Sequence, residues 1–204
     1  NGVFLGVWII LPKYIASDRL KLPITVVSSL LTWAILALLS LIIAREVTGG
    51  TISEMTLGMI GLVLLAILAI MFNLSNRAAP KGLNKVPIII LSIRGIAAGL
   101  AIAACLVLAE IGLPFVAGLA SAFPAIFLTS MVALWLSQGP QVPQGAAAPM
   151  MLGGASVSVY ALLAMWSLPS FGIFIGSIIA WFGAVGLWTI PAFLLLRKHR
   201  LGID

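Results

Sequence analysis

Hydrophobic residues run along this chain in long, unbroken stretches that are separated by short polar breaks. Seven such stretches lie at residues 2–11, 23–44, 55–74, 87–109, 114–136, 146–167 and 171–196. A helix needs about 20 apolar residues to cross roughly 30 Å of hydrocarbon, so the first stretch is too short and the other six are long enough. The pattern predicts an all-α, polytopic transmembrane helical bundle with about six full spans and a partial N-terminal one.

Prolines and short polar breaks predict where these helices begin and turn. Pro23, Pro87 and Pro114 precede or open apolar stretches and are predicted to start helices, because proline fits the first helical turn. The short breaks at 112–114 and 168–170 predict antiparallel helical hairpins.

Composition agrees with a membrane protein, because 62% of the residues are hydrophobic and 8% are charged. The formal charge of +6 would suggest nucleic-acid binding in a soluble protein. Here the basic residues lie at the ends of apolar stretches, so we expect contacts with anionic lipids and no nucleic acid. The single Cys105 and single His199 offer no metal-ligand spacing, and no cofactor is expected.

The distribution of basic residues predicts the topology. Nine of the eleven fall in three polar segments, and these residues are Lys13, Arg19, Lys21, Arg77, Lys81, Lys85, Arg197, Lys198 and Arg200. The positive-inside rule then places these segments, including the C-terminus, on the cytoplasmic side of the membrane. Six crossings from residue 23 to residue 196 return the chain to its starting side. A re-entrant segment 146–167 is the alternative that would break this parity.

A weak internal similarity links the first and last parts of the chain. Ser29 and Ser177, Trp33 and Trp181, Leu39 and Leu187, and Gly6 and Gly154 each lie 148 positions apart. Because the two copies would enter the membrane from opposite sides, they would form an inverted repeat, as in many secondary transporters. The predicted division is a partial first repeat at 1–46, a connecting helix at 47–80 and a four-helix second repeat at 81–204. On this hypothesis the chain is the C-terminal part of something longer.

The second repeat resembles the GlpM family of small bacterial inner-membrane proteins over residues 88–198. The resemblance is carried by Val116-Ala117-Gly118-Leu119, Phe123-Pro124, Ser137-Gln138-Gly139, Met165-Trp166-Ser167, Ile175-Gly176-Ser177 and Trp181. Glu110 departs from the family, which tends to be basic at that helix end. The resemblance implies a four-helix inner-membrane protein and supplies no catalytic residues.

Two ionisable residues within or beside the spans are candidate solute or lipid contacts. Arg94 lies seven residues inside the stretch 87–109, roughly 10 Å deep at 1.5 Å per residue. It either snorkels to the headgroups or serves as an anion-binding group that faces the bundle interior. Glu110 ends the same stretch, as a solvated helix terminus or as a proton or cation site beside Gly112.

Polar residues around a proline form the second candidate group. Pro124 lies inside the stretch 114–136 and is predicted to kink that helix. Ser121, Thr129 and Ser130 lie nearby and would line a cavity at the kink, or else bond to the carbonyls of their own helix. The uncharged segment 137–145 is predicted to be a loop, either plainly solvated or a gate.

Small residues and tryptophans complete the sequence pattern. Gly95 and Gly99, and likewise Gly172 and Gly176, have the spacing that lets helices pack closely. Tryptophans near predicted helix ends are expected to anchor at the membrane interface, and these are Trp8, Trp135, Trp166 and Trp188.

These features favour a transporter-like protein that binds or moves a small or lipid-like solute. The alternative is a non-catalytic accessory subunit that packs against partner proteins in a larger membrane complex. The membrane-embedded stretches contain no Ser/His/Asp set, phosphate-binding loop or carboxylate pair, so an enzyme is not expected. A lipid-modifying enzyme would need a polar cluster around Glu110.

Overall fold

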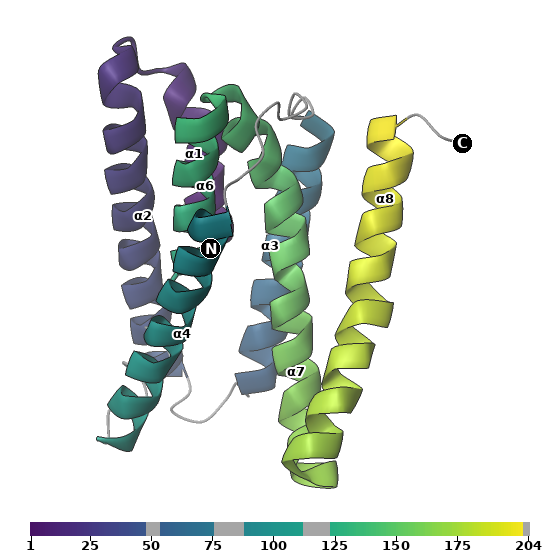
Figure 1. The fold of residues 1–204 in the computed structure, drawn as a ribbon. Coiled ribbons are helices and arrows are strands. Elements are labelled where there is room, and N and C mark those ends of the chain that lie inside the picture. The colour runs from purple at the N-terminus through teal and green to yellow at the C-terminus, as the bar shows by residue number, and fades with distance from the viewer. Residues whose placement is uncertain (48–53, 76–87, 112–122, 202–204) are drawn as a thin grey trace. The chain divides into compact units, whose positions relative to one another are not determined.

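The computed structural model describes residues 1–47, 54–75, 88–111 and 123–201, and all regular elements in these ranges are helical (Figure 1). η1 is a short 3-10 helix and η2 is a π-helical turn. The elements are α1 (Gly2–Ile10), η1 (Leu11–Lys13), α2 (Asp18–Val47), α3 (Glu54–Ser75), α4 (Ile88–Glu110), α6 (Ala125–Gln138), α7 (Gln141–Ala184), η2 (Val185–Thr189) and α8 (Ile190–Leu201). The predicted all-α class is confirmed for the described residues.

Three helices within these ranges are long and apolar enough to cross a membrane. They occupy Asp18–Ser40, Met55–Ser75 and Gln141–Lys198, the last of which runs through α7, η2 and α8 and is interrupted at Gly172. Their large apolar side chains are mostly exposed, as Leu31 of α2 and Met71 of α3 are, each at 58%. A water-soluble monomer rarely exposes apolar surface on this scale, whereas lipid tails would cover it. The helices are those of a membrane protein, and the described residues show three such helices where six spans were predicted.

The chain packs into two compact units, and each is described by itself. The first contains residues 3–43 and 79–147 together with Asn1, and the second contains residues 44–78 and 148–204 together with Gly2. The division into 1–46, 47–80 and 81–204 stays a prediction.

Helix α2, in the first unit, begins earlier than its proline predicted. Pro23 lies inside the helix, which starts at Asp18. The Asp18 carboxylate suits the positive end of the helix dipole, and it accepts a 2.7 Å hydrogen bond from Lys21 Nζ. Hydropathy therefore marked where the apolar stretch begins, and the helix extends beyond it into polar sequence. Pro87 and Pro114 lie outside the described residues.

Helix α6, also in the first unit, begins only after Pro124. Pro124 is the N-cap residue, with φ −78° and ψ 43°, and Ala125 is the first helical residue. A kink inside a longer helix was predicted at Pro124, and the structure instead shows a helix that starts there. Residues 112–122 lie outside the described ranges. A proline has no backbone N–H to donate, so it fits a position where no intrahelical donor is required.

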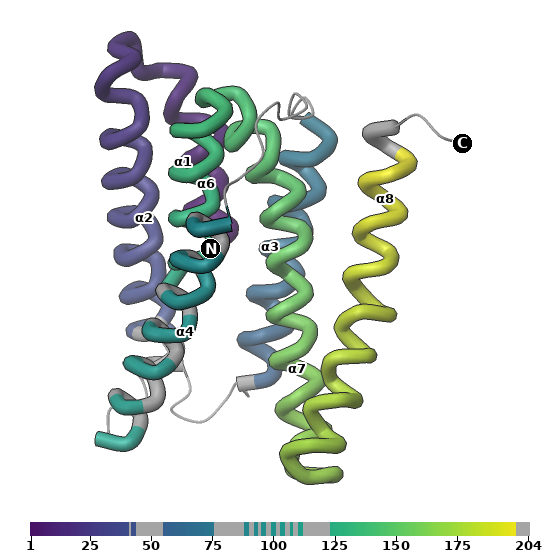
Figure 2. The backbone as a smooth tube through the Cα atoms, viewed as in Figure 1, coloured from purple at the N-terminus to yellow at the C-terminus, as the bar shows by residue number. Residues whose placement is uncertain are grey.

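Helix α7 replaces a predicted loop and contains the predicted hairpin. The helix starts at Gln141, so only Gly139 and Pro140 separate it from α6, and the predicted loop 137–145 is wrong. The chain then reverses direction within α7, which Figure 2 shows as a sharp bend in the tube. The reversal occurs at Gly172, where φ is 75° and ψ is 172°. This conformation is essentially restricted to glycine, which explains why the turn lies at Gly172 and not at 168–170.

Contacts within the second unit confirm that the two arms of the hairpin are antiparallel. Ser167 Oγ donates a 2.8 Å hydrogen bond to the carbonyl oxygen of Gly176. Farther from the turn, Trp188 Nε1 donates a 2.8 Å bond to the carbonyl oxygen of Leu152. Trp188 belongs to the π-helical turn η2. One bond therefore links the arms beside the turn, and the other links them farther along.

The two glycine pairs behave differently from each other. A Cβ atom added at Gly176 would lie 2.6 Å from the Ser167 carbonyl oxygen, so this glycine permits the close approach of the arms. Gly172, its predicted packing partner, forms the turn instead. Gly95 and Gly99 of α4 are exposed and have open space around them, so the predicted packing seam is not present among the described residues.

The structure does not support the internal repeat at an offset of 148. The turn between α1 and α2 lies at 14–17, and the corresponding positions 162–165 are inside α7. Conversely, Gly172 would correspond to Ile24, which is inside α2. Two helical hairpins whose turns are so far out of register cannot share one fold at that alignment.

Candidate functional site

Arg94 and Glu110 lie at opposite ends of α4 and do not form one site. Arg94 is the seventh residue of the helix, and Glu110 is the last. At 1.5 Å per residue they are about 24 Å apart along the axis. Glu110 is exposed, which agrees with the predicted helix terminus, and the Arg94 side chain lies outside the described part of the structure.

The hydroxyls near Pro124 bond to their own helix. Thr129 Oγ1 donates a 2.8 Å hydrogen bond to the carbonyl oxygen of Ala125, and Ser130 Oγ donates to that of Ile126. Of the two predicted alternatives, the bonds to the helix's own carbonyls are therefore the ones observed. Ser121 lies outside the described residues.

The residue next to Pro124 makes an aromatic contact. Pro124 is buried, and the ring of its neighbour Phe123 meets that of Trp33 edge-on, with centroids 5.2 Å apart. The described residues around Pro124 thus form a packed aromatic contact. They do not show the polar cavity that the proline predicted.

The same local bonding recurs elsewhere in the apolar helices. In α2, Thr25, Ser29, Thr32 and Ser40 each donate to a carbonyl three or four residues earlier. Ser137 of α6 and Ser156 of α7 do likewise. Hydrocarbon offers no hydrogen-bond partner, so a hydroxyl that bonds to its own backbone avoids the cost of an unsatisfied group.

Trp8 of α1 departs from this pattern. Its side chain is completely buried, and its indole Nε1 has no hydrogen-bond partner. The Trp8 ring lies 5.9 Å from that of Trp135, edge-on, and 6.4 Å from that of Phe4. The prediction of an interfacial anchor is wrong for Trp8, because an anchor keeps its N–H at the headgroups. A buried indole N–H usually finds an acceptor, so this donor needs an explanation.

Asn73 is a buried polar group that the sequence interpretation missed. It lies in α3, is 3% exposed, and its Nδ2 donates 2.7 and 2.8 Å bonds to the carbonyl oxygens of Ala69 and Ala148. The second bond joins α3 to α7 within the second unit. The signal in the sequence was an amide side chain near the end of an otherwise apolar stretch, which predicts an interhelical hydrogen bond.

Metal chemistry receives no support from the described residues. Within these ranges, no group of three or more histidine, cysteine, aspartate or glutamate side chains lies close enough to hold a metal ion.

Comparisons with protein-family models, with curated proteins and with solved structures found no match to this chain. The candidate site is therefore defined by its own geometry: a buried indole donor on α1 that is enclosed by aromatic rings.

Proposed function

We propose that this protein is a GlpM-like, non-enzymatic bacterial inner-membrane protein that binds a small or lipid-like solute in a transporter-like manner. The observation that supports this most strongly is the buried Trp8 indole N–H with no acceptor. Leaving such a donor unsatisfied costs about 1–3 kcal/mol. A solute with an acceptor oxygen would remove that cost at this position.

The chemistry around Trp8 indicates the class of solute. The rings of Phe4 and Trp135 offer apolar contact surface, and the indole offers one neutral donor. A carbonyl, ether or hydroxyl oxygen on an apolar body fits this combination, and a free ion does not. Lipids and lipid-like molecules carry such oxygens.

The membrane orientation is part of the proposal. The basic segments at 13–21, 77–85 and 197–200 lie in the cytoplasm, where they contact anionic lipids. Six crossings between residues 23 and 196 are consistent with that orientation. The support is the position of nine basic residues along the sequence.

The alternative is an accessory subunit of a larger membrane complex. The observation in its favour is the apolar surface of α4, where Ile93, Ile96 and Leu100 are each at least 60% exposed. Gly95 and Gly99 lie on the same helix with open space around them, which would admit the backbone of a partner helix.

Replacing Trp8 by phenylalanine tests the solute proposal. Trp8→Phe removes the unpaired donor and keeps an aromatic ring. We expect the wild-type protein, purified gently from membranes, to carry a bound small molecule or lipid in native mass spectrometry. We expect the Trp8→Phe protein to lose at least about tenfold in its occupancy, as the loss of one hydrogen bond worth about 1.4 kcal/mol predicts.

Trp188→Phe is the matched control. It also removes an indole N–H, but one that already donates to the Leu152 carbonyl. This variant should lower thermal stability and leave the bound molecule in place. A wild-type protein that carries partner polypeptides and no small molecule would favour the accessory subunit. Full occupancy in the Trp8→Phe protein would remove Trp8 from the site.

A further inference from the structure

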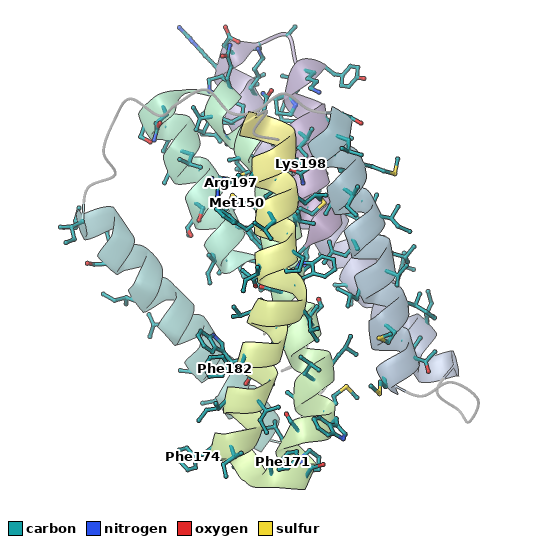
Figure 3. The ribbon with its side chains drawn as sticks, turned by 90° about the vertical axis from the view of Figure 1, so that its right-hand side faces the viewer. Met150, Phe171, Phe174, Phe182, Arg197 and Lys198 are labelled. Carbon is teal, nitrogen blue, oxygen red and sulfur yellow. The ribbon has the colours of Figure 1, made fainter. Side chains whose placement is uncertain are left out.

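The end of the α7 hairpin is an apolar turn with exposed aromatic side chains. We call residues 166–174 the hairpin tip. Phe174 is 86% exposed, Ile173 is 76% exposed and Trp166 is 55% exposed. The ring of Phe171 meets that of Trp166 edge-on at 5.6 Å, which leaves both rings at the surface. Figure 3 shows Phe171 and Phe174 at the end of the hairpin opposite Arg197 and Lys198.

The hairpin tip lacks the chemistry of a turn in water. No charged residue occurs between Glu110 and Arg197 in the sequence. The hydroxyl of Ser170 donates a 2.9 Å bond to the carbonyl oxygen of Trp166, so it is already satisfied within the turn. By contrast, the turn before α7 lies between Gln138 and Gln141, with Gln144 in the next helical turn. One turn is therefore rich in amides and the other is apolar.

Helix length places the hairpin tip relative to a bilayer. From Arg197 back to Gly172 there are 25 residues, which span about 37 Å at 1.5 Å per residue. Arginine and lysine side chains at a helix end favour the interface, so Arg197 and Lys198 define one boundary of the hydrocarbon. The hydrocarbon is about 30 Å thick and the bilayer with headgroups is about 40–45 Å thick. Each headgroup layer is therefore about 5–7 Å thick, and the tip lies about 7 Å beyond the far edge of the hydrocarbon, at the outer edge of the opposite headgroup layer.

We propose that the hairpin tip is a lipid anchor that inserts its aromatic side chains into the headgroup layer of the leaflet opposite the C-terminus. Tryptophan and other aromatic rings favour this layer because they combine an apolar body with weakly polar edges. Gly172 permits the tight turn, so the chain reverses without polar linker residues that would have to reach water. The anchor fixes the depth of the hairpin and does not depend on solute binding at Trp8.

A fluorophore at the tip tests this anchor. Phe174→Cys, in a Cys105→Ala background, places a single thiol at the most exposed tip residue, where no core contact is lost. The thiol is labelled with an environment-sensitive dye, and the protein is reconstituted into phosphatidylcholine and phosphatidylglycerol vesicles. We expect blue-shifted emission and an iodide quenching constant roughly tenfold below that of the control, since a charged quencher is excluded from an apolar layer. Nitroxide lipids labelled near the headgroup should quench the dye more strongly than lipids labelled deep in the acyl chain.

Gln141→Cys is the matched control, because it is an exposed position next to the other turn of the same helix. Its dye should have water-like emission and be quenched freely by iodide. Iodide quenching at position 174 equal to that at position 141 would overturn the anchor, because the tip would then be in water. Blue-shifted emission with no quenching by any nitroxide lipid would also overturn it, because another protein would then cover the tip.

Discussion

Replacing Gly176 by alanine is expected to lower the free energy of unfolding by about 2–4 kcal/mol and to separate the arms of the α7 hairpin. The added Cβ would lie 2.6 Å from the Ser167 carbonyl oxygen and 2.8 Å from Leu168 Cα. Both atoms belong to the backbone, so no side chain can rotate away to make room. The arms must move apart.

That movement also breaks a buried hydrogen bond. Ser167 is completely buried, and its hydroxyl donates to the Gly176 carbonyl oxygen. When the arms separate, this donor is left without its partner in an apolar environment, which adds to the cost of overpacking. Thermal unfolding in detergent, followed by helical circular dichroism, measures the loss.

Gly153→Ala is the control for the general effect of adding a methyl group to α7. A Cβ at Gly153 has open space around it, so this variant should be neutral or slightly stabilising through helix propensity. Equal melting temperatures for the Gly176→Ala and wild-type proteins would contradict the close approach of the two arms.

Replacing Asn73 by aspartate is expected to destabilise the second unit by about 2–3 kcal/mol. Asn73 Nδ2 donates to two carbonyl oxygens, those of Ala69 and Ala148. A carboxylate at this buried position has no N–H to donate, and it would face those oxygens with its own lone pairs. The link between α3 and α7 would be replaced by repulsion.

Two further variants separate the causes of this effect. Asn73→Leu removes the hydrogen bonds without adding charge, and we expect a loss between about 0.6 and 1.7 kcal/mol, which are the mean and the maximum measured for interhelical bonds in membranes. Ser75→Asp adds the same charge two residues away, at the exposed end of α3, and should have little effect. Reversible unfolding in mixed micelles measures all three. Equal losses for the aspartate variants at 73 and 75 would show that charge near the membrane edge, and not the buried contact, is responsible.

The sequence predicted best those elements whose length the bilayer determines. The stretch 55–74 corresponds to α3 at Glu54–Ser75, because an apolar run of this length has few alternatives to a spanning helix. Helix starts were predicted less well. α2 begins in polar sequence at Asp18, where capping and charge decide the boundary and hydropathy carries no signal.

The α7 hairpin shows a second limit of prediction from the sequence. A tight turn near residue 170 was predicted from proline, and the structure has one, but the reversal depends on the backbone conformation of Gly172. The break at 137–145 was predicted from the same residue types, and most of it is helical. Proline and glycine thus indicate that a break is possible, while the positive φ that Gly172 adopts fixes where the chain reverses.

The candidate site was the least predictable part. For Thr129 and Ser130 the sequence left two alternatives open, a cavity lining or a bond to their own helix, and the structure shows the local bond. The burial of Trp8 and Asn73 could not be read from periodicity. Helices that are apolar on every side have no polar face to indicate which residues point inward.

Membrane orientation of the α7 hairpin is the central claim, and cysteine accessibility tests it most directly. In a Cys105→Ala background, Gln141→Cys places one thiol at the start of the first arm, and Leu201→Cys places one thiol at the end of the second arm. Both positions are far in sequence from the hairpin tip. If both arms cross the membrane and the C-terminus is cytoplasmic, a membrane-impermeant maleimide should label neither thiol in intact cells and both in inverted membrane vesicles. Labelling of one thiol in intact cells and of the other only in inverted vesicles would contradict the double crossing. Labelling of both in intact cells would contradict the orientation.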